Sequence, residues 1–100
     1  MPNVIGRGVH ATAIQWPGFT LDAWPQDLID FFGVGQQNIV PAIVKAMWVT
    51  DEGGHYVTQV KTPNGWAGLP DGAYLVKLNQ GGALYAYDAD TFAKCWKVVT

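Results

Sequence analysis

Two pairs of glycines divide the second half of this chain into short segments. Gly53-Gly54 and Gly81-Gly82 each separate two short runs that are rich in β-branched and aromatic residues. Such runs are typical of strands, and a glycine turn between two of them predicts a β-hairpin. Strands joined by a tight turn run antiparallel. We therefore predict two hairpins, with strands over residues 42–50 and 55–62 and over residues 73–78 and 83–87.

One more strand and two helices complete the predicted fold. An alternating run predicts a strand over 9–16, which ends at a Pro-Gly turn. Apolar residues at three- and four-residue steps predict a helix over 25–32, and Gly33 stands where a helix C-terminus favours glycine. Asp88 is a suitable N-cap for a helix over 89–96. The sequence therefore predicts a single α+β domain, residues 1–100: a small antiparallel sheet of about five strands with two short helices packed on it.

The run 42–50 differs from the others because both of its faces are largely apolar. Val44, Ala46 and Trp48 alternate with Ile43 and other mostly apolar residues. A strand that is apolar on both faces is typical of a buried position. We therefore expect a central strand here, with Trp48 in the core.

The composition is apolar and poor in charge. Hydrophobic residues make up 49% of the 100 residues and charged residues 14%, whereas about a quarter of an ordinary globular chain is charged. A chain of this size buries about two-thirds of its unfolded surface. The remaining apolar surface needs a cover, and a large exposed apolar patch marks an interaction site. We therefore expect a homo-oligomer.

The charge pattern argues against nucleic-acid binding. The six basic residues are scattered, whereas nucleic-acid binders carry a basic stripe. A single cysteine, Cys95, fits a reducing compartment. The N-terminal segment lacks the apolar core of a signal peptide, and no run approaches the ~20 apolar residues of a membrane span. We expect a soluble cytoplasmic protein without membrane contact.

Candidate catalytic groups each have a plainer structural interpretation. Cys95 with His10 or His55 could serve as nucleophile and base, and the two histidines could bind a metal. A free cysteine is more often a small buried hydrophobe, and two histidines alone are a weak metal signal. Asp88 and Asp90 suit a helix start better than acid–base chemistry. We expect no enzymatic activity, no metal and no cofactor.

The aromatic residues are the most informative feature. Five tryptophans are many for 100 residues. Trp24, Trp48 and Trp96 have predicted core positions, but two others lie at a strand end and in a Gly/Pro-rich loop. Aromatic side chains supply contact area at protein interfaces, and they can also stack on a base. The alternative is that all of them serve core and hairpin packing. The predicted binding residues are Trp16, Trp66, Tyr85 and Tyr87.

The last third of the chain resembles a group of small phage and prophage proteins. Their shared pattern is a Pro-Gly-Asp turn, an apolar strand, a glycine turn, a Tyr-containing strand and a helix with Asp, Phe and a final aromatic. The matching residues here are 69–76, Gly81-Gly82, Leu84-Tyr85, Asp90-Thr91-Phe92 and Trp96, and 14–16 and 31–33 in the first third are similar too. This chain departs from the pattern in having Pro70-Asp71-Gly72 at the turn, and the acid that usually follows the second hairpin's glycine is missing.

The resemblance implies a setting rather than a reaction. It implies a small accessory protein of a bacterial virus or prophage. Our first hypothesis is a protein that binds and occludes a host protein, for example an anti-CRISPR-like inhibitor of host defence. A second is a protein that sequesters a nucleotide signal between aromatic faces, with Arg7 or Lys77 as its cation. A third is a structural virion or assembly component, which would be present in purified particles.

Overall fold

A computed structural model describes residues 3–99 and confirms an α+β fold with antiparallel pairing. Each predicted strand and helix is present, with ends that differ by at most two residues. The strands and helices in chain order are β1 (Asn3–Gly6), β2 (Val9–Gln15), α1 (Gln26–Phe32), α2 (Gln36–Ile39), β3 (Val44–Val49), η1 (Asp51–Gly53), β4 (His55–Thr62), β5 (Gly65–Gly68), β6 (Tyr74–Leu78), β7 (Leu84–Tyr87), α3 (Ala89–Cys95) and β8 (Lys97–Val98).

The strands form two sheets, so the prediction of a single sheet is wrong. One sheet has the order β7-β6-β2-β1-β8 and the other has the order β3-β4-β5. The first predicted hairpin pairs with β5 rather than with β2, and that separates it from the second hairpin. The strands β1 and β5 and the helix α2 are too short to show a clear periodicity in the sequence, and they were not predicted.

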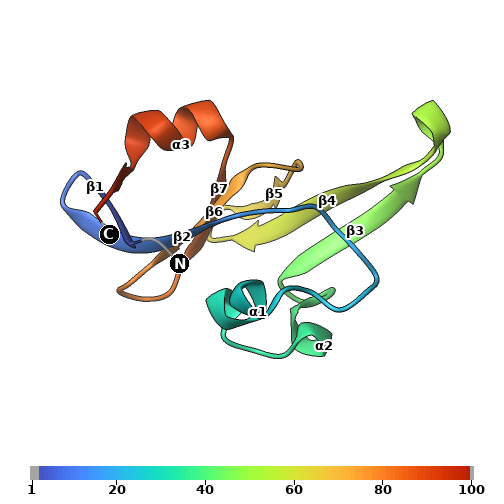
Figure 1. Ribbon diagram of the computed structural model, residues 1–100, viewed down its shortest axis with the longest axis horizontal. Helices are drawn as coiled ribbons and strands as arrows, with labels where there is room; N and C mark the ends of the chain where they lie inside the picture. Colours follow the sequence, from blue (N-terminus) through green and yellow to red (C-terminus); the bar gives the residue numbers. More distant parts are fainter. Residues whose placement is uncertain (1–2, 100) are drawn as a thin grey trace.

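The five-stranded sheet has a hydrophobic core on each face. Side chains alternate across a strand, and β2 sends Ala11 and Ala13 to one face and Ile14 to the other. The helix α3 covers the first face through Phe92. The helices α1 and α2 and the second sheet lie on the other side, where Trp16 is fully buried. Figure 1 shows α3 and α1 on opposite sides of β2 and β6.

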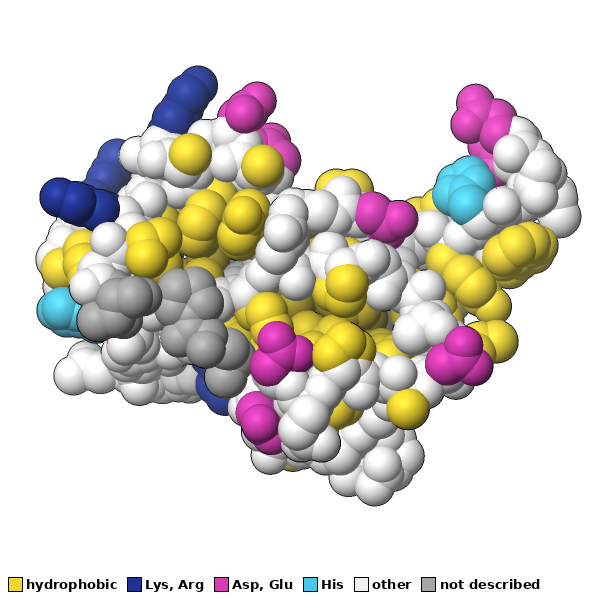
Figure 2. Space-filling view, viewed as in Figure 1, with side chains coloured by type: hydrophobic (Ala, Val, Ile, Leu, Met, Phe, Trp, Pro, Cys, Tyr) yellow, Lys and Arg dark blue, Asp and Glu magenta, His cyan; other side chains and the backbone are white. Residues whose placement is uncertain are grey.

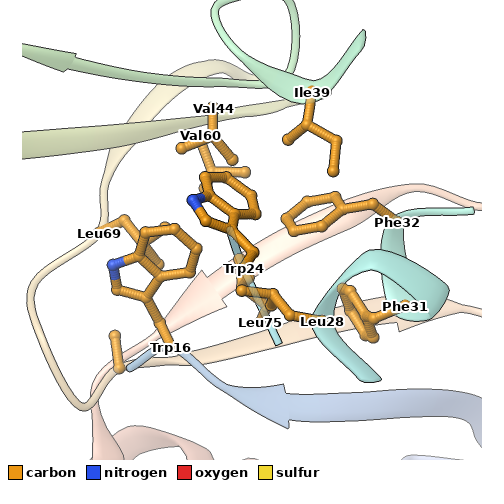
Figure 3. Packing of buried hydrophobic residues seen from close by; sticks show 11 residues of the cluster. Trp16, Trp24, Leu28, Phe31, Phe32, Ile39, Val44, Val60, Leu69 and Leu75 are labelled. Atoms are coloured by element: carbon orange, nitrogen blue, oxygen red, sulfur yellow. The ribbon is translucent and has the colours of Figure 1, made fainter. Parts of the chain in front are cut away.

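The larger core is built around tryptophan and phenylalanine rings (Figure 3). Trp16 and Trp24 meet edge to face with ring centroids 5.4 Å apart. Phe31 and Phe32 from α1 reach the same core, and their centroids are 5.5 Å apart. Val44, at the start of β3, is also fully buried there. This core therefore fixes the base of the second sheet against the first.

Specific hydrogen bonds stabilise the ends of α1 and α3. Gly33 ends α1 in the left-handed conformation, φ 77°, and its N–H donates to the carbonyl of Ile29. The Lys77 Nζ donates to the carbonyl of Phe31 at 3.1 Å, so β6 carries a cation to the negative end of α1. At α3, the Asp88 carboxylate accepts from the Thr91 N–H at 2.7 Å, which confirms the predicted N-cap.

The hairpin β3–β4 extends from this core as an arm, which we define as residues 44–62 (Figure 1). Its strand β3 lies at a sheet edge, so the expectation of a central strand is wrong. Trp48, which was expected in the core, is 54% exposed. Only the base of β3 reaches the core, through Val44, and the rest of the strand runs out beyond it. Its apolar pattern on both faces therefore does not reflect burial.

Candidate functional site

One face of the three-stranded sheet points away from both cores. In the register of β3, β4 and β5, Met47 lies beside Val57, Lys45 beside Gln59, and Lys61 beside Trp66. Residues paired in this way share a face, and neighbours two apart along each strand do too. We call this surface the outer face. Its members are Lys45, Met47, Val49, His55, Val57, Gln59, Lys61 and Trp66.

The outer face is uncovered and largely apolar at its centre. Met47 is 66% exposed, Val57 44% and Trp66 39%. A shallow hollow of about 320 Å³ is lined by Lys45, Met47, Val57 and other side chains of the arm. Contiguous exposed apolar side chains rimmed by polar ones are typical of a protein interaction site. The outer face has both an exposed apolar centre and polar residues around it.

The charges on the outer face are basic. Lys45 Nζ lies 4.2 Å from the centroid of the Trp66 ring, a cation–π contact across β4. Lys61 is the cross-strand neighbour of Trp66. At the tip of the arm, His55 Nδ1 lies 3.6 Å from the Asp51 carboxylate. The chain as a whole has a net charge of −2. The positive charge at the base of the outer face therefore has the opposite sign to the net charge of the protein.

The opposite, inner face of the arm carries a row of aromatic rings. Trp48 and Tyr56 are cross-strand neighbours with centroids 5.0 Å apart, and Phe19 from the loop before α1 lies 4.8 Å from Tyr56. Figure 2 shows hydrophobic side chains along this arm below the acidic and histidine side chains of its tip. The arm thus exposes apolar groups on both faces. Two-stranded hairpins are marginally stable alone, so these contacts support its outer half.

The four predicted binding residues lie in different surroundings. The expectation that Trp16 is exposed is wrong: it is 0% exposed, and its indole N–H has no hydrogen-bond partner within residues 3–99. Trp66 is exposed on the outer face. Tyr85 and Tyr87 are half-buried in β7, and the Tyr87 ring lies 6.2 Å from that of Trp96 beside α3. The structure therefore does not bring these residues together, and only Trp66 belongs to the outer face.

The candidate catalytic groups are spread over the molecule. Cys95 is exposed on α3, whereas His55 lies at the tip of the arm, at the opposite end in Figure 1. The Asp88 carboxylate is engaged as a helix cap, and the Thr91 N–H lowers its pKa below the ordinary value of 3.8. Within residues 3–99, no three side chains of the metal-binding types come together. No helix in that range is long and apolar enough to cross a membrane.

Sequence reasoning missed most of the outer face. Met47, Val57 and Lys45 were not among the predicted binding residues. The available signal was the run 42–50, which is apolar on both faces and carries one lysine. An apolar run of this kind suits a buried strand, and it equally suits an edge strand that meets a partner. Periodicity alone does not separate these two situations.

Comparison with known proteins adds no relative. No protein-family model, no curated protein and no solved structure matches this chain at a significant level.

Proposed function

We propose that this protein acts without catalysis, by docking the outer face of its three-stranded sheet onto a partner protein. The observation that carries the proposal is the uncovered apolar centre formed by Met47 and Val57 beside the exposed Trp66. Large apolar and aromatic side chains dominate the energy of protein interfaces. In this proposal Trp66 is the anchor and Lys45 is its polar rim.

The resemblance to phage and prophage proteins supplies the setting of the proposal. The partner is then a protein of the bacterial host, and the protein acts by covering a surface that the host protein needs. An arm that stands away from the body can reach into a partner's groove, which suits occlusion. The support for the setting is the pattern of the C-terminal third, and the support for the docking mode is the exposed arm.

A variant series tests the docking mode. The tagged protein is immobilised, a lysate of a bacterial host is passed over it, and retained proteins are identified by mass spectrometry. Trp66→Ala and Met47→Ala remove the proposed contact area, so a specific host protein should be retained by the wild type and lost from both. Leu21→Ala is the matched control, because Leu21 is 78% exposed and lies outside the three-stranded sheet.

Comparison of the variants shows whether the outer face binds the partner. Circular dichroism first shows that each variant is folded. Retention of the same host protein by Leu21→Ala, and its loss from Trp66→Ala, supports the outer face. Equal retention by Trp66→Ala and Met47→Ala would contradict the proposal, because the truncated side chains would then contribute nothing to binding.

One observation favours a nucleotide as a second candidate. Trp66 lies between two lysines, with Lys45 at its ring and Lys61 as its cross-strand neighbour. An aromatic face beside cations could stack a base and hold a phosphate. Lys77, which was considered for this role, is less suitable, since its Nζ donates to the Phe31 carbonyl. A panel of cyclic and ADP-ribose nucleotides should then raise the melting temperature, and the absence of any shift would exclude tight binding.

A further inference from the structure

The strand β3 is the longest exposed edge among the described strands. The other edge strands are short: β5 and β7 have four residues each and β8 has two, whereas β3 has six. Short edges resist pairing with other chains, and a long apolar edge invites it. Beyond Val44 this edge carries Ala46, Met47, Trp48 and Val49, with Lys45 as its one charge. It is therefore the edge best suited to accept another strand.

The backbone of β3 offers hydrogen bonds at this edge. The Lys61 N–H donates to the Ile43 carbonyl at 2.8 Å, and the two residues continue the β3–β4 register. In an antiparallel pair, hydrogen-bonded positions alternate. The residues 45, 47 and 49 therefore direct their N–H and C=O groups toward β4. Ala46 and Trp48 direct theirs away from β4, to the free edge.

The charge along the arm changes sign from base to tip. Lys45 lies near the base of β3, and Asp51 and Glu52 lie at the tip. Met47 and Trp48, which are 66% and 54% exposed, lie between them. A second arm of the same kind, running antiparallel, would meet an opposite charge at each end and apolar groups in the middle. The arm is thus complementary to a copy of itself.

We propose that two copies of this chain form a two-fold symmetric dimer by antiparallel pairing of their β3 strands around Trp48. In this register Trp48 exchanges hydrogen bonds with Trp48 of the second copy, and Ala46 faces Thr50, the residue that follows β3 in the second copy. Met47 then lies beside Val49 of the second copy, and Lys45 lies near Asp51, the first residue of η1 in the second copy. A two-fold axis makes every contact occur twice, as in most homodimers.

The side chains of the proposed charge pair lie on the same face. Lys45 is on the outer face, over Trp66, and Asp51 is held near His55, which is also on the outer face. Exposed cation–π contacts and ion pairs to histidine are weak restraints, so Lys45 and Asp51 can turn toward each other across the new seam. The pairing joins two three-stranded sheets into one of six strands.

Charge reversal tests the dimer with the protein alone. The molecular mass of the wild type is measured by size-exclusion chromatography with light scattering over a range of concentrations. Lys45→Asp places two acids together, and Asp51→Lys places two lysines together. Each single variant should raise the dissociation constant of the dimer about tenfold, and the double variant should restore it, since the pair is then complementary again.

Two further variants separate the alternatives. Ala46→Pro removes an outward N–H but no β3–β4 hydrogen bond. It should therefore abolish the dimer, while circular dichroism shows that the chain is folded. If this variant does not fold, the charge variants still test the dimer. Trp66→Ala should remain dimeric, because Trp66 is not part of the β3–β3 seam. A failure of the dimer proposal can therefore be distinguished from a failure of partner docking. A wild type that is monomeric at every concentration, or single charge variants that dimerise as well as wild type, would overturn the inference.

Discussion

The rings of Tyr74 and Phe92 are stacked, with centroids 4.2 Å apart and planes inclined by 6°. Tyr74 belongs to β6 and Phe92 to α3, so this stack holds the helix on the sheet. Phe92 is 7% exposed and packs with Val4 and Val76.

Phe92→Ala should lower the free energy of unfolding by about 3 kcal/mol, because it removes the stack and leaves a cavity under α3. Phe92→Leu should cost less, since it keeps most of the apolar volume. Urea unfolding followed by circular dichroism measures both. A loss for Phe92→Ala no larger than that for Phe92→Leu would show that α3 is held by other contacts.

Truncation to alanine should destabilise the protein much more at Trp16 than at Trp66. Trp16 is fully buried and meets the Trp24 ring at 5.4 Å, so Trp16→Ala should cost about 4 kcal/mol of unfolding free energy. Trp66 is 39% exposed and its ring contacts the Lys45 ammonium, so Trp66→Ala should cost at most about 1 kcal/mol. Thermal and urea unfolding of the two variants give the comparison. Similar losses would contradict the burial assigned to Trp16.

Substitution of the glycine that ends α1 should lower the stability of the protein. Gly33 has a φ of 77°, which an L side chain adopts at a cost of about 1–2 kcal/mol. Gly33→Ala should therefore lower the free energy of unfolding by about 1 kcal/mol. Gly68→Ala is the matched control, because a methyl group at Gly68 meets nothing within 4 Å and its φ lies outside the left-handed region. Equal stability of the two variants would argue against the α1 cap.

The cap of α3 should make stability depend on pH in acid. The Thr91 N–H lowers the pKa of Asp88 in the folded protein below 3.8. A carboxyl whose pKa is depressed by folding stabilises the protein fully above its unfolded pKa, and that stabilisation is lost as the pH falls through the folded pKa. Asp88→Ala should therefore be less stable than wild type at neutral pH, and the difference should shrink below pH 3.8.

The control for the cap is Asp90→Ala, since Asp90 lies in the first turn of α3 without the capping bond. It should change stability less than Asp88→Ala at neutral pH. Melting temperatures measured across the acid range give the comparison. A difference between wild type and Asp88→Ala that stays constant through this range would show that the carboxylate is not the stabilising group.

Local patterns in the sequence predicted the elements better than their arrangement. Gly53-Gly54 and Gly81-Gly82 marked both hairpins, and Asp88 marked the start of α3, because turn and cap preferences act between near neighbours. The division into two sheets depends on contacts between distant segments, such as the pairing of Ala13 with Val76. Nothing in either segment alone specifies that pairing, so the single-sheet prediction failed.

The candidate site was predicted only in part for a similar reason. The exposure of Trp66 was predicted correctly, because a Gly/Pro-rich segment gives a tryptophan little reason to be buried. Trp16 and Trp48 were assigned the wrong way round, since a strand end looks exposed and a doubly apolar strand looks central. Whether each tryptophan is buried depends on where its strand contacts the core. That depends on the place of β2 and β3 in the two sheets.

The position of β2 has a consequence for how the chain must fold. This strand lies between β1, its neighbour in sequence, and β6, which pairs Ala11 with Leu78. The β1–β2 hairpin can form early, but both of its edges pair with segments much later in the chain, β2 with β6 and β1 with β8. Pairing between such distant residues is slow, because a long loop must close first. During synthesis, the β1–β2 hairpin would therefore leave the ribosome with both edges unpaired, and we expect it to need shielding until β6 and β8 emerge.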